Sequence, residues 1–241
     1  MKKLLLITAL FFTGLSTIGQ NWLDVGIKGL WGPTFLFNQN IFDDANYNHQ
    51  ITTKGGFGAK IGYNFGPNHE VTFDFMMSNF GQDFKFNISD TTDNSTSEYS
   101  SDITYKSFDF LLMYRNNNNG KYFEVGPIIS NVRSANRTIE GVNDPLFDMS
   151  ALNKIQTGIT IGFGAYFFGT ENFGVTSGVR ISYMASDLIG SKGQTLGYPS
   201  NTIYPSYKAS HPLYVQLVFE ANLDFAYLAR ASCGRTKLLM F

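Results

Sequence analysis

The stretch Leu213–Phe225 reads LYVQLVFEANLDF and decides the fold. Its odd-numbered positions are all apolar, whereas its even-numbered positions include Gln216, Glu220 and Asp224. Successive side chains of a β-strand point to opposite faces, so this alternation predicts a strand with one apolar face and one polar face. At 13 residues the segment is longer than the roughly five or six residues of a usual strand, and it is long enough to cross a bilayer at a tilt.

The same alternation recurs along the rest of the chain and gives eight predicted strands. Their approximate ranges are 22–31, 54–65, 70–77, 107–115, 121–130, 158–167, 173–183 and 213–225. Pro127 cannot donate a hydrogen bond to a sheet, so it predicts either a bulge or a shorter fifth strand. After residue 20 no apolar run approaches 18 residues, which excludes a helical membrane protein.

The connections between these strands alternate in length. Short turns rich in Gly, Pro and Asn occupy 66–69, 116–120 and 169–172, and long polar loops occupy 38–53, 87–102, 132–153 and 186–212. An eight-stranded antiparallel up-and-down barrel whose long loops all lie at one rim produces this order, as transmembrane β-barrels do. The sequence therefore predicts an all-β transmembrane barrel over 20–225 that closes by pairing its last strand with its first.

The composition of the two strand faces predicts which face is the inside. The apolar face is almost free of charge and is rich in Phe, Val, Leu and Ile, as expected for lipid contact, whereas the other face carries glycine and charges of both signs. The interior of an eight-stranded barrel is narrow, and side chains can fill it. We therefore expect these charges to pair across the lumen. The predicted lumen charge network comprises Asp24, Lys28, Lys60, Glu70, Asp74, Asp109, Arg115, Glu124, Arg180, Glu220 and Asp224.

Both ends of the chain carry further signals. Residues 1–19 combine Lys2 and Lys3 with an apolar run and small residues, which predicts a cleaved secretory signal peptide and export. Without those two lysines the mature chain has 16 basic and 19 acidic residues, and this balance favours no nucleic-acid partner. Residues 226–241 form a basic tail, interpreted as a periplasmic extension or an additional strand, and its Cys233 as an unpaired thiol.

With these features the chain resembles the small eight-stranded outer-membrane β-barrel proteins of Gram-negative bacteria, similar in architecture to the OmpA transmembrane domain, to OmpX and to PorT-like barrels. The resemblance implies a place in the bacterial outer membrane, contact with its lipid, and assembly by the barrel-insertion machinery. It also implies that a C-terminal aromatic residue, here Phe241, is the insertion signal. The alternating pattern ends at Phe225, however, which departs from the family because 16 residues follow.

Three functions are compatible with this reading. The first is a non-enzymatic barrel with a largely filled lumen, whose four long loops contribute to envelope integrity, adhesion or assembly with envelope proteins. The second is a narrow cation-preferring channel, favoured by seven acids against four bases in the lumen set. The third is a rim enzyme using His49 and His211 with neighbours such as Asp44 and Ser210. No metal-ligand spacing, phosphate-binding loop or nucleophile motif is present, so we expect no cofactor and no metal.

Overall fold

Eight long antiparallel strands form a closed ring in the computed structural model, which describes residues 20–89, 96–170, 172–200, 203–232 and 235–240. The order around the ring is β1-β3-β4-β5-β6-β8-β9-β10, and β10 pairs with β1 to close it, as predicted. The ring strands are β1 (Gln20–Phe37), β3 (Thr52–Phe65), β4 (His69–Ser89), β5 (Thr96–Asn118), β6 (Lys121–Ile139), β8 (Ile155–Gly169), β9 (Phe173–Met184) and β10 (His211–Ser232).

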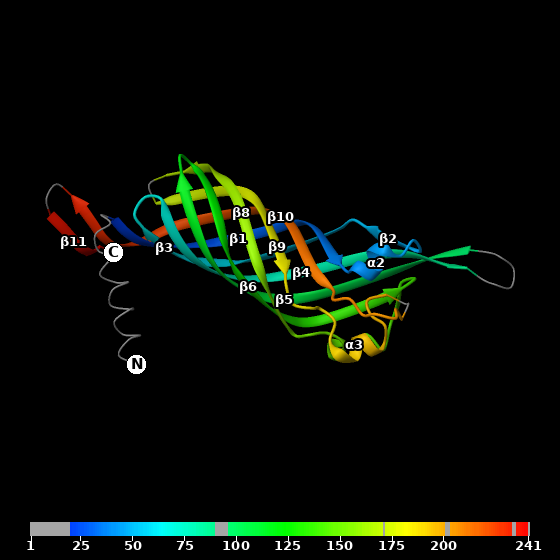
Figure 1. Ribbon diagram of the computed structural model, residues 1–241. Coiled ribbons are helices and arrows are strands. Elements are labelled where there is room, and N and C mark those ends of the chain that lie inside the picture. The colour runs from blue at the N-terminus through cyan, green and yellow to red at the C-terminus, as the bar shows by residue number, and fades with distance from the viewer. Residues whose placement is uncertain (1–19, 90–95, 171, 201–202, 233–234, 241) are drawn as a thin grey trace, which may run out of the picture.

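The smaller elements gather at the two ends of the barrel. The end with the long connections carries α2 (Gln39–Asp43), β2 (Tyr47–Gln50), β7 (Val142–Asn143), η1 (Met149–Ala151) and α3 (Ser191–Thr195), whereas β11 (Arg235–Met240) lies at the opposite end beside β10 (Figure 1). The short turns lie at this second end, which is the periplasmic side of a barrel of this kind. Asn119 and Gly120 turn with positive φ between β5 and β6, as Asn and Gly readily do.

The outer surface of the barrel carries a continuous apolar belt. Ile27 and Phe57 keep 69% and 65% of their surface exposed, although neither has a polar group to hydrate. Such a surface on a closed barrel with polar residues inside fits a hydrocarbon environment, because the ring leaves no strand edge unpaired in the lipid. The belt includes Ile27, Trp31, Phe57, Ile61, Phe73, Phe110, Leu112, Phe123, Ile159, Phe163, Phe219 and Leu223.

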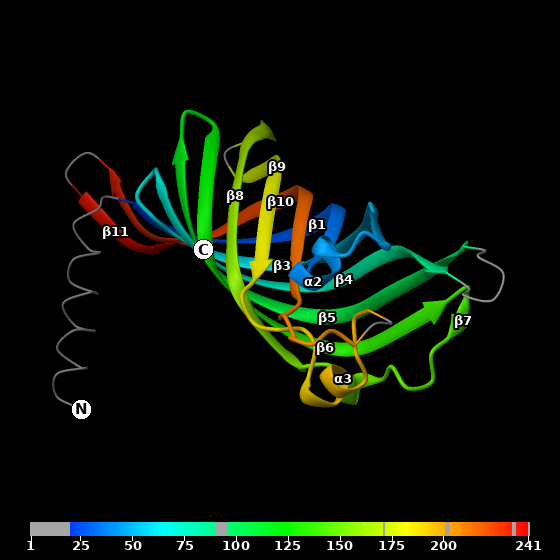
Figure 2. The same cartoon turned by 45° about the vertical axis from the view of Figure 1, so that its right-hand side comes forward.

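Several strands are longer than the sequence pattern indicates. β4 and β5 pair from His69↔Asn116 to Ser89↔Thr96, so most of the predicted loop 87–102 is strand. β6 likewise runs to Ile139, inside the predicted loop 132–153. These three strands extend well beyond the rest of the ring (Figure 2). The prediction was wrong here because the apolar and polar faces exchange sides at this end, which hides the membrane-type pattern.

Two further expectations need correction. Pro127 neither bulges nor shortens β6, because the register is the same on both sides of it, with Leu111↔Ile128 and Tyr114↔Val125. The bulge between β5 and β6 instead lies at Lys106/Ser107. The last strand does not end at Phe225, since β10 continues to Ser232 and pairs with β11. The signal peptide and Phe241 lie outside the described residues, and the periplasmic assignment of the tail stays a prediction.

Candidate functional site

The periplasmic half of the lumen holds a layer of charged side chains contributed by seven strands. The register places several acids and bases directly opposite each other on neighbouring strands, including Lys28↔Glu220, Lys60↔Asp74 and Arg115↔Glu124. Opposite charges at such positions attract each other and limit the cost of burial. Sequence reasoning identified these residues but not their partners, because the register was not fixed.

Nine of the eleven predicted residues form one connected ion-pair network. Arg115 is at its centre: its guanidinium makes a bidentate contact with Glu220 at 2.8 and 2.7 Å, and Nη2 also lies 2.8 Å from Glu124 Oε2. Bidentate pairs of this kind are the strongest ion-pair geometry. The members are Asp24, Lys28, Lys60, Glu70, Asp74, Arg115, Glu124, Arg180 and Glu220.

The remaining cations connect the acids across the lumen. Lys28 Nζ lies 2.6 Å from Asp74 and 3.0 Å from Glu220, and Arg180 Nη2 lies 2.6 Å from Glu124 and 3.1 Å from Asp74. The side chains of the four basic residues are 0–2% exposed. The network therefore contains five acids and four bases whose side chains are at most 5% exposed, and it fills this level of the barrel.

Asp109 and Asp224, the other two predicted residues, lie apart from the network. Asp109 accepts a hydrogen bond from Ser130 Oγ at a buried position nearer the outer side. Asp224 faces Asp24 across the β1–β10 pairing and lines a vestibule of about 270 Å³ at the periplasmic mouth. Two of the three surplus acids thus lie in separate places outside the network, so the acid surplus does not line one path through the lumen.

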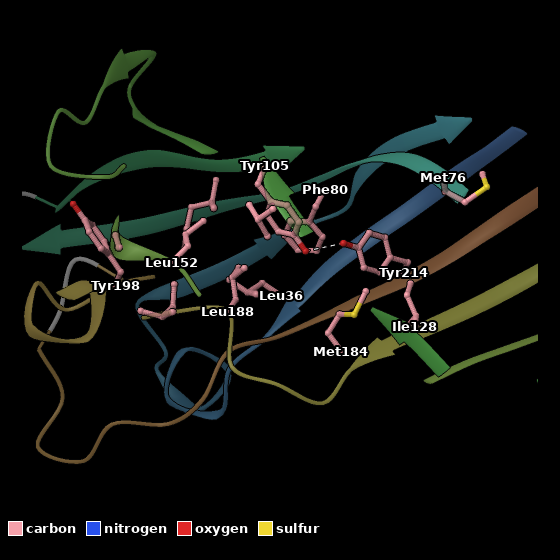
Figure 3. Close-up of a cluster of buried hydrophobic side chains, with 14 of the residues drawn as sticks. Leu36, Met76, Phe80, Tyr105, Ile128, Leu152, Met184, Leu188, Tyr198 and Tyr214 are labelled. Atoms are coloured by element: carbon pink, nitrogen blue, oxygen red, sulfur yellow. Dashed lines mark hydrogen bonds between the residues drawn. The ribbon is translucent and has the colours of Figure 1, made fainter. Parts of the chain in front are cut away.

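A plug of apolar and aromatic side chains fills the outer half of the lumen (Figure 3). Phe80 stacks on Tyr105 with ring centroids 4.7 Å apart and meets Tyr214 edge-on at 5.5 Å. The hydroxyl groups of Tyr105 and Tyr214 hydrogen-bond to each other at 2.7 Å, so neither is buried without a partner. The cavity between the plug and the charged layer measures only about 10 Å³. The plug was not predicted, because Phe80 and Tyr105 lie outside the predicted strands.

The outer connections are joined to each other above the plug, and we call them the cap (residues 38–51, 137–154, 186–200 and 203–212). Asn38 Nδ2 donates hydrogen bonds to Lys208 O at 2.8 Å and Ser210 Oγ at 2.9 Å. Tyr198 Oη donates to Asp144 at 2.9 Å, and burial with Asp144 nearby raises the pKa of Tyr198 to about 12, so it remains a donor at neutral pH. Bonds between distant segments hold the cap in one arrangement.

The two rim histidines do not form an enzyme-like group. His49 stacks on Phe42 with ring centroids 4.1 Å apart, and burial lowers the pKa of His49. His211 Nδ1 lies 3.2 Å from Met184 O. Ser210, the hydroxyl considered as a nucleophile, accepts from Asn38 instead of contacting a histidine. Within the described part of the chain, no group of His, Cys, Asp and Glu is arranged to hold a metal ion, and no helix is long and apolar enough to cross a membrane.

An acidic pair lies on the outward face of the extended strands. Asp83 and Asp102 are directly opposite each other on β4 and β5, beyond the exposed Lys106 that follows the apolar belt. Burial and the neighbouring carboxyl of Asp83 raise the pKa of Asp102 to about 6. Sequence reasoning missed the pair, because both residues were outside the predicted strands.

No family model and no curated protein matches the chain. Among solved structures, the neisserial surface protein NspA aligns with 84% of this chain and 97% of its own, at 11% identity and a TM-score of 0.43. The outer-membrane protein OprG of Pseudomonas aeruginosa aligns over 86% and 96%, at 10% identity and a TM-score of 0.45. The N-terminal β-barrel domain of OprF from the same organism aligns over 86% and 100%, at 14% identity and a TM-score of 0.35. The closed ring, the apolar belt and the charged lumen described above give this chain the architecture of a small eight-stranded β-barrel of the outer-membrane type.

Proposed function

We propose that this protein is a sealed, non-enzymatic membrane scaffold that presents the cap to partners in or outside the envelope. The charged layer is the observation that carries the first part of the proposal. Four cations and five acids interlock with almost no exposed surface, and the apolar plug lies directly above them. Two consecutive filled layers leave ions no hydrated route along the lumen.

The cap supports the second part of the proposal. Its segments are joined by side-chain hydrogen bonds, so a partner would meet a surface that needs little ordering on binding. That surface carries exposed apolar side chains, among them Phe42, Val142, Leu146 and Ile203. Apolar side chains exposed beyond the membrane are a common mark of protein contact surfaces. This arrangement favours adhesion or assembly with envelope proteins over transport.

Planar-bilayer recording tests the sealed lumen. Purified protein inserted into a bilayer in symmetric salt should give no steady conductance, while a porin inserted under the same conditions reports that insertion and detection work. Steady, cation-selective conductance steps from this protein would contradict the proposal and would favour the channel function.

A further inference from the structure

The barrel wall contains a gap near its outer rim, between β3 and β4. The hydrogen-bonded pairing between these strands ends at Gly56↔Ser78. On this edge of β4 the next pairing is with β2, and it begins at Gln50↔Asp83. On the inside, Thr34 of β1 replaces the missing partner: its hydroxyl donates to Gly81 O at 2.6 Å and accepts from Gly81 N at 3.3 Å. Both backbone hydrogen-bonding groups of Gly81, in the middle of the gap, are therefore satisfied.

Lys54 extends across this gap. Its position in β3 follows the inward series of Gly56, Gly58 and Lys60, yet its side chain lies against Gly81 of β4. A Cβ atom at residue 81 would collide with the Cε atom of Lys54, so a larger residue there would displace the end of the Lys54 side chain. Odd-numbered residues of β4 such as Met77 and Asp83 face outward, and the end of the Lys54 side chain lies where a Cβ atom of Gly81 would point, so it is on the outer side of the wall.

The neighbouring strand pair has a second irregularity at the same height. Lys106 pairs with Ser134 but Ser107 pairs with Val132, so Arg133 is the extra residue of a β-bulge. A bulge breaks the alternation of side chains. Arg133 and Ser134 are consequently both exposed, and the guanidinium of Arg133 lies 5.2 Å from the centre of the Phe108 ring.

A pocket of about 510 Å³ opens outward between the gap and the bulge, a volume suited to a small ligand or headgroup. Lys54 and Lys106 line it with Asn79 and Asn136, and the exposed Trp31 supplies apolar surface. Arg133 directly precedes Ser134, which lines the pocket. No ion pair within the described residues neutralises Lys106 or Arg133, so the pocket presents an excess of positive charge.

The position of this pocket defines its ligand. Phe108 belongs to the last outward apolar level of β5, and the next outward residues along β4 and β5 are Asn79 and Lys106. The pocket therefore lies where lipid headgroups meet the hydrocarbon core. Lysine and arginine bind phosphate through charge-assisted hydrogen bonds, and basic pockets at this level bind phosphorylated headgroups. We propose that the pocket binds the phosphorylated headgroup of an outer-leaflet lipid.

Measuring lipid binding to the full-length protein tests this proposal. Native mass spectrometry of purified protein titrated with diphosphorylated lipid A should show binding that falls at least tenfold in the double variant Lys106→Gln with Arg133→Gln. Each single substitution should lower it roughly threefold, which preserves the test if the double variant does not fold. The matched control, Lys85→Gln with Lys192→Gln, removes two exposed cations elsewhere and should bind like the parent protein.

Two comparison ligands identify the group that is recognised. Lipid A without its phosphates should bind at least tenfold more weakly than the diphosphorylated form. Inorganic phosphate should displace the lipid only at far higher concentration. The proposal is overturned by equal binding of the dephosphorylated lipid, by unchanged binding in the Lys106/Arg133 variants, or by displacement with equimolar inorganic phosphate, which would indicate a free-phosphate site.

Discussion

The two halves of β4 follow the same alternation with opposite chemistry. In the periplasmic half, Phe73 and Met77 face outward and Asp74 faces the lumen, whereas in the outer half Asp83 and Lys85 face outward and Phe84 is buried inside. The alternation keeps its phase throughout, because it is fixed by the backbone. The external medium changes from lipid to water, and the apolar face changes sides with it. Charged side chains therefore fill the periplasmic half of the lumen, and the apolar plug fills the outer half.

The largest effect should come from removing the central cation of the charged half. Arg115→Met leaves Glu220 and Glu124 without their main partner inside the barrel, which should lower the free energy of unfolding by about 3–5 kcal/mol. Reversible urea unfolding in lipid vesicles measures this. Lys85→Met, which breaks the exposed pair with Glu98, should change stability by less than about 1 kcal/mol. Equal losses would show that the network is not desolvated.

The second-largest effect should come from introducing a charge on the outward face, because its cost in stability should differ between the two halves. Leu112 and Thr104 both point outward on β5, on opposite sides of the change in medium. Leu112→Arg should cost about 2–4 kcal/mol because it places a cation in hydrocarbon. Thr104→Arg should change stability by less than about 0.5 kcal/mol, as an ordinary surface substitution does. Similar costs in the same vesicle assay would contradict the assigned membrane boundary.

The strands and lumen charges of the membrane half could be predicted almost completely from the sequence, whereas the strands of the outer half could not. Lipid outside and charge inside give an alternation strong enough to locate eight strands and all eleven lumen charges. In the outer half, after Ser78 on β4 and before Lys106 on β5, the polar side chains face outward, as in a soluble sheet. These segments therefore lacked the membrane pattern and were predicted as loops. The partners of Arg115 and the plug depend on register and strand tilt, which no local pattern contains. Asp109 and Asp224 were assigned to the right face but to a network that neither joins.

A smaller effect is expected within the plug. Tyr214→Phe removes the hydrogen-bond partner of the Tyr105 hydroxyl in an apolar setting, which should cost about 1–2 kcal/mol. Adding Tyr105→Phe should recover part of that loss, because no hydroxyl then remains unpaired. A double-mutant cycle measured by urea unfolding checks this. Strict additivity of the two losses would mean that the hydroxyl pair is hydrated.

The smallest effect is pH-dependent and belongs to the outer half. The pKa of Asp102 is raised from 3.8 to about 6, so its ionised form destabilises the folded state above that pH. Asp102→Asn should therefore stabilise the protein by about 1 kcal/mol at pH 8, after allowance for its partial exposure. This advantage should disappear as the pH falls from 6 to 4. An advantage that is independent of pH would exclude the acidic pair as its cause.

The exchange of faces can be measured directly along one strand. Spin labels placed singly at Thr104, Lys106, Phe108, Phe110 and Leu112, which all face outward on β5, report contact with lipid-dissolved oxygen or with a water-soluble relaxation agent. We predict that Thr104 and Lys106 contact water and that Phe108, Phe110 and Leu112 contact lipid, with the change between 106 and 108. Oxygen-dominated relaxation at 104, or water-dominated relaxation at 110, would contradict the account.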